Sequence, residues 1–420
     1  MALYGLIDGN SFYCSCEQAF DPALRDKPVV VLSNNDGCVI ARSALAKAVG
    51  IKMGDPWHLI RRRPELSEVV AKSSNYSHYG DLSRRVFEIL GAHVQRLEPY
   101  SIDETFLDLA PVTGDLMEFC QMLRGAVRQI AKIPTCVGVG PSKTIAKAAN
   151  KLAKSRPELN GVCDLRDEAT RVALYQDLGI GEVWGIGGKT AEKLAARGVR
   201  TVADFLRLDP RKVRDMMSVV GARVQAELRD VSCLPLSLMA PQRKGIAVTR
   251  SFGMPITDWW TMREAVASYA TRAGEKLREH GLLASTMTVL LHTNPHNGDP
   301  WYSNQHSARI EATNDTTSLI GEAIRMLEPM WRAGFRYSKA GIMLGELIDA
   351  GSQPMSLFPT KDPVRSARAM AALDAVNGRF GRDTLRPLAT GISRTWTAKA
   401  MNLSPRYTTR VGEILVGTAY

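Results

Sequence analysis

The sequence predicts an α+β protein in which two β-α-β-β-α-β units flank a region of short helices. Strand-like apolar runs and amphipathic helical segments follow one another in the same order twice, over residues 3–154 and again over residues 246–347. Residues 166–237, between the two units, contain short helical segments that glycines interrupt. Because 420 residues exceed the size of one ordinary hydrophobic core, we expect several domains.

The first unit begins with a short strand that ends at an acidic residue. Residues 3–7 form an apolar run that stops at Asp8, and residues 9–11 supply turn and cap chemistry before a helix from Phe12. An insertion over about residues 22–77 follows. Within it we predict a strand, a turn and a helix, over residues 28–32, 33–37 and 41–49.

After the insertion, the first unit resumes with two strands over residues 97–109 that meet near residues 101–104. An amphipathic helix follows, and then a strand over residues 135–139 and a basic helix over residues 142–154. The apolar residues of the amphipathic helix recur at helical spacing: Leu116, Phe119, Cys120, Leu123, Val127 and Ile130. This order predicts a ferredoxin-like split β-α-β sheet with its helices on one face.

The helical region contains two segments, residues 183–188 and 219–222, that resemble helix-hairpin-helix elements, and residues 241–244 form a polar linker. Strands of the second unit are predicted over residues 246–252, 286–292, 307–312 and 340–347. Its helices are predicted around Met262, Val266, Tyr269, Ala273 and Leu277, and over residues 316–331.

The chain is basic, with 54 Lys and Arg residues against 43 Asp and Glu residues, a net charge of +11 and a pI near 9.3. This excess favours a polyanionic partner, because basic side chains release counterions from phosphates. Residues 351–420 hold ten basic and four acidic residues, a balance of +6, in a sequence with little periodic pattern. We therefore predict a basic, partly ordered C-terminal tail.

Several protein classes are excluded by composition. No apolar run reaches the ~18 residues that cross a bilayer, and residues 1–8 lack the features of a secretory signal, so a cytoplasmic protein with no membrane partner is expected. The seven cysteines include no C-x-x-C pair. A disulfide framework or a structural zinc site is therefore not expected.

Asp8 and the pair Asp103 and Glu104 are predicted to meet at one edge of the first sheet, because neighbouring strands lie ~4.8 Å apart. Mg²⁺ prefers carboxylate and phosphate oxygens, and two-metal phosphoryl transfer needs carboxylates that bridge ions ~3.5–4 Å apart. From spacing alone, a helix cap at Asp8 and a solvated turn at residues 103–104 are the commoner interpretation, since structural acids outnumber catalytic ones. The surrounding residues make the difference.

Three runs around these acids resemble the Y-family, translesion DNA polymerases: Asp8-Gly-Asn-Ser-Phe-Tyr13, Lys27-Pro-Val-Val-Val-Leu32 and Tyr100-Ser-Ile-Asp-Glu-Thr-Phe106. Four further runs resemble its UmuC-like members: Ser33-Asn-Asn-Asp-Gly-Cys-Val-Ile-Ala-Arg42, Gly50-Ile-Lys-Met-Gly-Asp-Pro-Trp57, Arg250-Ser-Phe-Gly253 and Leu403-Ser-Pro-Arg-Tyr-Thr-Thr-Arg410. The resemblance covers essentially the whole chain. It implies an error-prone DNA polymerase of the SOS response, which transfers nucleotides from a dNTP to a primer 3′-hydroxyl opposite damaged template.

The resemblance also implies a division into four parts and a tail. These are a ferredoxin-like palm (1–24 and 78–165), small fingers (25–77), a helical thumb with helix-hairpin-helix elements (166–238), a little finger (239–350) and a basic C-terminal tail with a clamp-binding peptide (351–420). It implies two Mg²⁺ ions as cofactors. The ligands would be the carboxylates of Asp8, Asp103 and Glu104 and the backbone carbonyl of Gly9.

Three residues match nucleotide-binding positions of the family. Tyr13 matches the steric gate, whose ring occupies the space of a ribose 2′-hydroxyl, whereas Phe12 fits better as a core residue. Lys154 matches a lysine that contacts the triphosphate, and Lys47 falls where many relatives place an arginine for the same purpose. The sequence departs from the broader family at Ala41, and likewise at Ala44, where a threonine and a tyrosine are common.

Sequence-independent contacts to primer–template DNA are expected from two regions. Backbone N–H groups at Gly185 and Gly187 would contact a phosphate, although tight helix packing explains these glycines nearly as well. Arg243, Lys244 and Arg250 are candidate phosphate contacts of the little finger, and a solvated basic surface is the alternative.

The implied protein partners are a sliding clamp, a processed UmuD-type dimer and RecA. Gln353, Leu357 and Phe358 lie in a short segment that resembles clamp-binding peptides. No local pattern indicates where the UmuD-type dimer or RecA would bind. Two alternative functions remain at this stage, a palm-type nucleotidyl cyclase and a non-catalytic DNA-binding scaffold.

Overall fold

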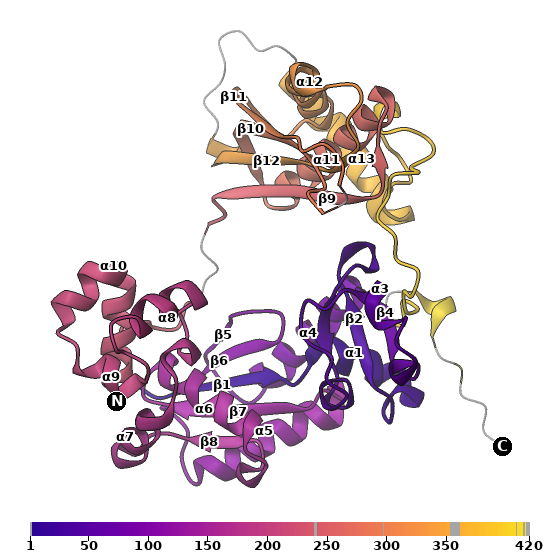
Figure 1. The fold of residues 1–420 in the computed structure, drawn as a ribbon. Coiled ribbons are helices and arrows are strands. Elements are labelled where there is room, and N and C mark those ends of the chain that lie inside the picture. The colour runs from indigo at the N-terminus through magenta and orange to yellow at the C-terminus, as the bar shows by residue number, and fades with distance from the viewer. Residues whose placement is uncertain are drawn as a thin grey trace. The chain divides into compact units, whose positions relative to one another are not determined.

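The computed structural model describes residues 2–238, 242–296, 298–352, 362–408, 410–414 and 416. It divides into two compact units (Figure 1). Among the described residues, unit 1 comprises residues 2–33, 37–238 and 402–416, and unit 2 comprises residues 34–36 and 242–401. The C-terminal end of the chain therefore returns to unit 1.

Unit 1 is built on a sheet with strand order β5-β6-β1-β7-β8. Its strands are β1 (Tyr4–Gly9), β5 (Leu97–Pro99), β6 (Glu104–Asp108), β7 (Thr135–Gly140) and β8 (Val162–Asp164). β1 pairs antiparallel with both β6 and β7, which is the ferredoxin-like arrangement that the order of elements predicts. β8, parallel to β7, is an additional edge strand.

Helices cover both faces of this sheet: the helices within the β-α-β-β-α-β unit lie on one face, as predicted, and the basic helix that follows the unit lies on the other. α1 (Phe12–Phe20), α4 (Tyr76–Gly91) and α5 (Leu116–Ala131) form one core with Ile7 and Leu107, whereas α6 (Lys143–Ser155) packs on the other face near Leu6 and Phe106. The reason is that all six residues of β1 are buried, so each face of the strand needs an apolar partner.

The insertion forms a small second sheet in unit 1, with order β3-β2-β4. It contains β2 (Val29–Leu32), β3 (Val39–Arg42), β4 (Val70–Ser73) and the short helices α2 (Ala44–Ala48) and α3 (Trp57–Ile60). The predicted helix over residues 41–49 is wrong at its start, because residues 39–42 pair with β2 as a strand. The helix begins only after Ser43, whose hydroxyl caps the backbone N–H of Ala46 at 3.2 Å.

Short helices of residues 168–228 pack around their own apolar core, as predicted. They are α7 (Glu168–Asp177), α8 (Gly188–Ala195), α9 (Val202–Arg207) and α10 (Pro210–Leu228). Gly185 has φ +88° just before α8, a left-handed conformation that favours glycine. The predicted second hairpin corresponds to a break within α10 at Ser218, whose φ of 62° interrupts the helix.

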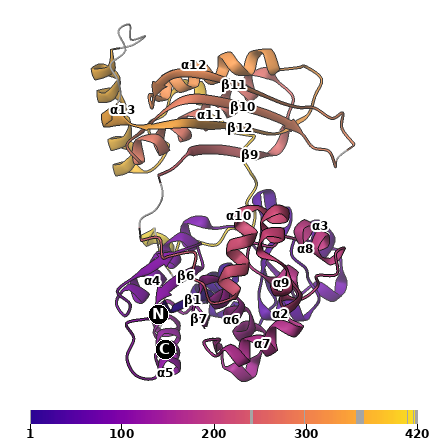
Figure 2. The same cartoon turned by 90° about the vertical axis from the view of Figure 1, so that its left-hand side faces the viewer.

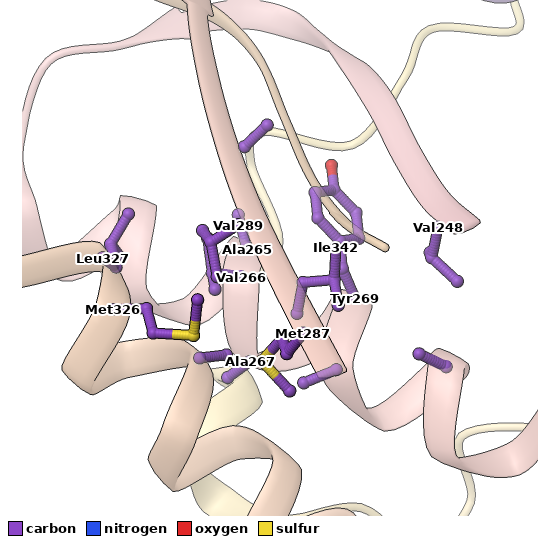
Figure 3. Packing of buried hydrophobic residues seen from close by; sticks show 14 of the residues in the cluster. Val248, Ala265, Val266, Ala267, Tyr269, Met287, Val289, Met326, Leu327 and Ile342 are labelled. Atoms are coloured by element: carbon purple, nitrogen blue, oxygen red, sulfur yellow. The ribbon is translucent and has the colours of Figure 1, made fainter. Parts of the chain in front are cut away.

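Unit 2 has the predicted β-α-β-β-α-β order. Its elements are β9 (Gly245–Ile256), α11 (Trp259–Glu279), β10 (Leu282–Thr293), β11 (Ser303–Thr313), α12 (Thr316–Leu327) and β12 (Tyr337–Asp349). The strand order is β11-β10-β12-β9, so the first strand lies at the edge here and in the centre of unit 1 (Figure 2). Met287 and Ile342 of the sheet pack against Val266 and Tyr269 of α11 (Figure 3).

The C-terminal region is more ordered than the sequence predicts. Residues 363–380 form α13 (Pro363–Phe380), which packs in unit 2 through an ion pair of 2.7 Å between Arg278 Nε and Asp374 Oδ2, and through the buried Met370. A docked helix within residues 351–420 is compatible with the expected partly ordered tail, although the sequence analysis did not predict this helix. The predicted clamp-binding residues Gln353, Leu357 and Phe358 lie outside the described residues.

Two negative expectations concern membranes and cysteines. In the part of the chain that the structure describes, no helix is long and apolar enough to span a bilayer. All seven cysteines lie in that part, and each is a free thiol.

Candidate active site

The three predicted acidic residues lie at one end of two neighbouring strands of the unit 1 sheet, where β1 ends and β6 begins. Asp8, near the end of β1, is the register partner of Glu104 at the start of β6. The backbone N–H of Gly9 donates to the carbonyl of Asp103 at 2.9 Å, which holds the turn before β6 against the end of β1. Antiparallel pairing therefore brings together carboxylates that are far apart in the sequence.

Each carboxylate has a polar partner in the same unit. Lys154 Nζ lies 2.5 Å from Asp8 Oδ2. Lys147 Nζ donates to Glu104 Oε1 and Oε2 at 2.9 and 3.0 Å. The hydroxyl of Ser101 donates to Asp103 Oδ1 at 2.6 Å.

Asp8 is the most perturbed of the three acids. Its side chain is nearly buried, and burial is the main cause that raises its pKa from 3.8 to about 7. The adjacent Lys154 ammonium lowers this pKa in part, while the charges of Asp103 and Glu104 raise it further. A bound cation at this position would therefore favour the ionised form of Asp8.

The donor set suits a hard dication, because all three acidic side chains offer carboxylate oxygens. As the side chains stand, no group of three His, Cys, Asp or Glu residues within the described ranges converges as metal ligands. Each carboxylate instead contacts a partner of its own, which is Lys154 for Asp8, Lys147 for Glu104 and Ser101 for Asp103.

A cavity of 470 Å³ opens directly onto the acidic edge. Its walls come from the sheet edge, from the start of α1, from β3 and α2, and from α6. The residues lining it are Asp8, Gly9, Ser11, Phe12, Tyr13, Ile40, Ala41, Arg42, Lys47, Met53, Ile102, Asp103, Glu104 and Lys154. The predicted metal-binding and nucleotide-binding residues thus share one cavity of a size common for small-molecule sites.

Tyr13 and Phe12 lie in different environments, as the sequence predicts. Phe12 belongs to the buried core, whereas Tyr13 is partly exposed in the cavity wall. The ring of Tyr13 stacks on Tyr79, with centroids 4.6 Å apart and planes inclined by 18°. Lys47, in α2, donates from Nζ to the hydroxyl of Ser11 at 3.1 Å.

Comparison with known proteins decides the family. The model of the impB/mucB/samB family matches residues 7–151, and the model of its C-terminal domain matches residues 243–357. A third model, a domain of unknown function (DUF4113), matches residues 367–416. Protein UmuC of Salmonella typhimurium is 40% identical over 419 residues, which cover 98% of this chain and 99% of that protein. The chain belongs to the impB/mucB/samB family.

Other relatives agree with membership of the impB/mucB/samB family. Protein MucB of Escherichia coli is 38% identical, with 99% of this chain and 100% of that protein covered. DNA polymerase IV 1 of Bacillus subtilis is 25% identical, with 91% and 92% covered. A solved Y-family DNA polymerase chimera of Dbh and Dpo4 has a TM-score of 0.68 at 20% identity, covering 83% of this chain and 99% of that one, and therefore supports the fold alone.

These findings confirm the predicted identity as a UmuC-like, Y-family polymerase. The chain is an error-prone, translesion DNA polymerase, with the α+β fold of palm, fingers, thumb and little finger, and it binds DNA and dNTP. A nucleotidyl cyclase or a non-catalytic scaffold is not favoured. Y-family polymerases are metal-dependent enzymes.

Within this polymerase, sequence analysis missed Lys147, Ser101 and Arg42. Lys147 is bound to Glu104, and its ammonium lies 4.5 Å from the ring centroid of Tyr100. Its signal was present, because Lys147 and Lys154 are seven residues apart on a basic helix and so share one face. Arg42 lines the cavity and donates from Nη1 to the carbonyl of Ile51 at 2.6 Å.

The predicted DNA contacts come from two other regions of the chain. Gly185 and Gly187 immediately precede α8, with Gly187 as its N-cap. Arg243 and Lys244 are exposed before β9, and Arg250 is exposed on β9, an edge strand of unit 2. None of the five lines the cavity, so their roles stay predictions.

Proposed function

We propose that Asp8, Asp103 and Glu104 are the catalytic, metal-binding carboxylates of this polymerase, and that its cofactor is a pair of Mg²⁺ ions. The single observation that carries the proposal is the position of all three acids on one sheet edge that lines the 470 Å³ cavity. The backbone carbonyl of Gly9, next to Asp8, is proposed as a further ligand. When bound, the ions would activate the primer 3′-hydroxyl and neutralise charge on the departing pyrophosphate.

The cationic residues of the cavity are proposed to hold the triphosphate of a dNTP. Lys154, whose ammonium group pairs with Asp8, would contribute that group. Lys47 would approach from α2, on the fingers side of the cavity. Together they would orient the α-phosphate toward the primer terminus, so that attack and departure lie in line.

Tyr13 is proposed as the steric gate of sugar selection. Its ring lines the cavity and is supported from behind by the stacked ring of Tyr79. A rigid aromatic side chain at this position would collide with a ribose 2′-hydroxyl and leave space for a deoxyribose. Selection would then act on nucleotide binding rather than on the chemistry of transfer.

The predicted domain division is retained as part of the proposal: palm 1–24 and 78–165, fingers 25–77, thumb 166–238, little finger 239–350. We further propose that Gly185 and Gly187 offer backbone N–H groups to a DNA phosphate, since both glycines are exposed and lie just before α8. Arg243, Lys244 and Arg250 would make phosphate contacts from exposed positions, as a polymerase that copies any template must avoid base-specific readout.

Partnership with a sliding clamp, a UmuD-type dimer and RecA is proposed from sequence motifs and family membership, with a cytoplasmic location and a role in the SOS response. The clamp-binding residues would be Gln353, Leu357 and Phe358. Replacing Leu357 and Phe358 by alanine is expected to reduce clamp-stimulated synthesis and to leave basal synthesis unchanged. Equal stimulation of the variant and the wild type would reject this docking peptide.

Primer extension tests the catalytic proposal. Synthesis on damaged and undamaged templates is measured with and without Mg²⁺, for the wild type and for Asp103→Ala. We expect synthesis only with Mg²⁺ and the intact acid, and DNA binding in every case. Wild-type extension by Asp103→Ala would remove the central assignment.

A further inference from the structure

Residues near the C-terminal end of the described chain pack beside α1 and α4, the helices that carry Tyr13 and Tyr79. We define residues 402–408 as the C-terminal clasp. The clasp belongs to unit 1, whereas the preceding residues up to 401 belong to unit 2. It also falls within residues 367–416, which match a domain of unknown function.

The clasp is attached first at the end of β4. The backbone N–H of Ser73 donates to the carbonyl of Asn402, and the backbone N–H of Asn402 donates to the hydroxyl of Ser73, both at 2.9 Å. Farther along, Tyr407 stacks on Phe20 of α1, with centroids 5.1 Å apart and planes inclined by 17°. Tyr407 is 6% exposed, so this contact is buried rather than superficial.

Between these two attachments, Ser404 enters a buried polar cluster at the start of α4. Asn75, the N-cap of α4, donates from Nδ2 to the hydroxyl of Ser404 at 2.9 Å. That hydroxyl donates in turn to Glu17 Oε1 at 3.1 Å. Glu17 and Ser404 are 0% and 3% exposed, so water does not replace these bonds without a change in packing.

The same oxygen of Glu17 accepts a second hydrogen bond, from the phenol of Tyr79 at 2.7 Å. Burial raises the pKa of Glu17, and the hydrogen bonds from Tyr79 and Ser404 lower it. Both donors therefore stabilise the same buried carboxylate. Because Tyr79 is fully buried and stacks on Tyr13, a continuous series of contacts joins the clasp to the cavity wall: Ser404, Glu17, Tyr79, Tyr13.

We infer that the C-terminal clasp positions the nucleotide gate, and that Ser404 is a positioning residue for sugar selection. The clasp fixes Glu17, Glu17 fixes the phenol of Tyr79, and the ring of Tyr79 limits how far Tyr13 withdraws from the cavity. This inference rests on the proposed role of Tyr13 as the gate. Part of the domain of unknown function would then help the enzyme to distinguish dNTP from rNTP.

A purely structural clasp would stabilise unit 1 and leave sugar selection unchanged. The two roles differ because removal of the Ser404 hydroxyl leaves the backbone attachments of the clasp intact. Ser404→Ala therefore loosens Glu17 while the clasp stays docked. Tyr79→Phe removes the other hydrogen bond to the same carboxylate, since phenylalanine lacks the hydroxyl group but keeps the ring that stacks on Tyr13.

The experiment measures single-nucleotide insertion of dNTP and rNTP by the full-length enzyme, as kcat and KM for each, together with Tm. Ser404→Ala and Tyr79→Phe are each expected to lower the preference for dNTP over rNTP about threefold to tenfold, through a lower KM for rNTP. This effect corresponds to part of the free energy that one charge-assisted hydrogen bond contributes. The double variant should show less than the product of the two effects, because both act through Glu17. Ser366→Ala is the matched control, since its hydroxyl also donates to a carboxylate, Asp315 Oδ2 at 2.6 Å, but in unit 2.

The gate itself is tested in parallel by Tyr13→Ala. If Tyr13→Ala lowers the preference while Ser404→Ala and Tyr79→Phe do not, the gate stands and the inference about the clasp is overturned, even if Tm falls. If Tyr13→Ala also leaves the preference unchanged, the proposed gate fails and the inference fails with it. A loss of preference in Ser366→Ala equal to that in Ser404→Ala would likewise overturn a specific role for the clasp.

Discussion

Replacing Asp103 by asparagine removes one negative charge from the acidic sheet edge and preserves the shape of the side chain. The hydrogen bond from the Ser101 hydroxyl to Oδ1, 2.6 Å long, remains possible because the amide oxygen is also an acceptor. The free energy of unfolding should therefore change by less than about 0.5 kcal/mol. Folding and DNA binding are expected to survive.

The catalytic effect of this substitution should be much larger. A ligand to a catalytic ion contributes several kcal/mol of transition-state stabilisation, and each 1.36 kcal/mol corresponds to a factor of ten in rate, so we expect the single-turnover rate to fall by at least about 10³-fold. The measurement is single-turnover primer extension with saturating dNTP and Mg²⁺. DNA binding by fluorescence anisotropy and Tm are measured on the same samples.

Asp108→Asn is the matched control. Asp108 is the last residue of β6, whereas Asp103 lies just before the first residue of this strand, so the two acids lie at opposite ends of it. The partner of Asp108 is Arg96, 3.5 Å away and largely exposed, so this substitution should cost no more than about 1 kcal/mol of stability. An Asp103→Asn rate within tenfold of the Asp108→Asn rate would refute the assignment. If Asp103→Asn lost both DNA binding and primer extension, its effect would be structural instead.

Three further predictions concern the gate, the buried acid and the helix that carries the lysines. Tyr13→Ala should raise rNTP incorporation at least about tenfold, as measured by competitive insertion, because it removes the ring that excludes the 2′-hydroxyl. For Asp8, the folded-state pKa of about 7 exceeds the ordinary 3.8, so the metal-free folded state holds an extra proton between these values. The folded protein should therefore become less stable as pH rises from about 4 to about 7, and Asp8→Asn should flatten this part of a Tm–pH profile. Gly138→Ala would place Cβ 2.0 Å from the backbone nitrogen of Asn150 on α6, so unfolding should become easier by about 3 kcal/mol or more, whereas Gly125→Ala, with open space around it, should be neutral or slightly stabilising in the same denaturant titration.

Local sequence was sufficient to predict the strand that carries Asp8 and the helix that follows it. An apolar run ending in an acid, followed by turn and cap residues, indicates β1 and α1 without any knowledge of the rest of the chain. The repeated β-α-β-β-α-β order was also readable, since hydrophobic spacing differs between strands and helices. The strand order of unit 2 was not, because β9 lies at an edge, whereas β1, which begins the same series, lies in the centre of the ferredoxin-like sheet.

The partners of the acidic residues were not predictable from local pattern. Lys147 reaches Glu104, and Lys154 reaches Asp8, only because α6 crosses the sheet close to β7. That close approach depends on Gly138, where any side chain would collide with the helix backbone. Residues 41–42, the end of β3, were mistaken for helix for a related reason, since their conformation is decided by pairing with β2.

The sequence by itself determined the family, the identities of the three acids and the order of the elements, because these depend on residue type and on spacing over a few turns. The tertiary structure alone decided that helices cover both faces of the first sheet, and that Ser404 lies against Glu17, a residue 387 positions earlier in the chain. Such contacts arise when separately formed elements bury their remaining apolar and polar groups against one another. Hydrophobic periodicity records that a group must be buried, but it carries no information about which distant segment will cover it.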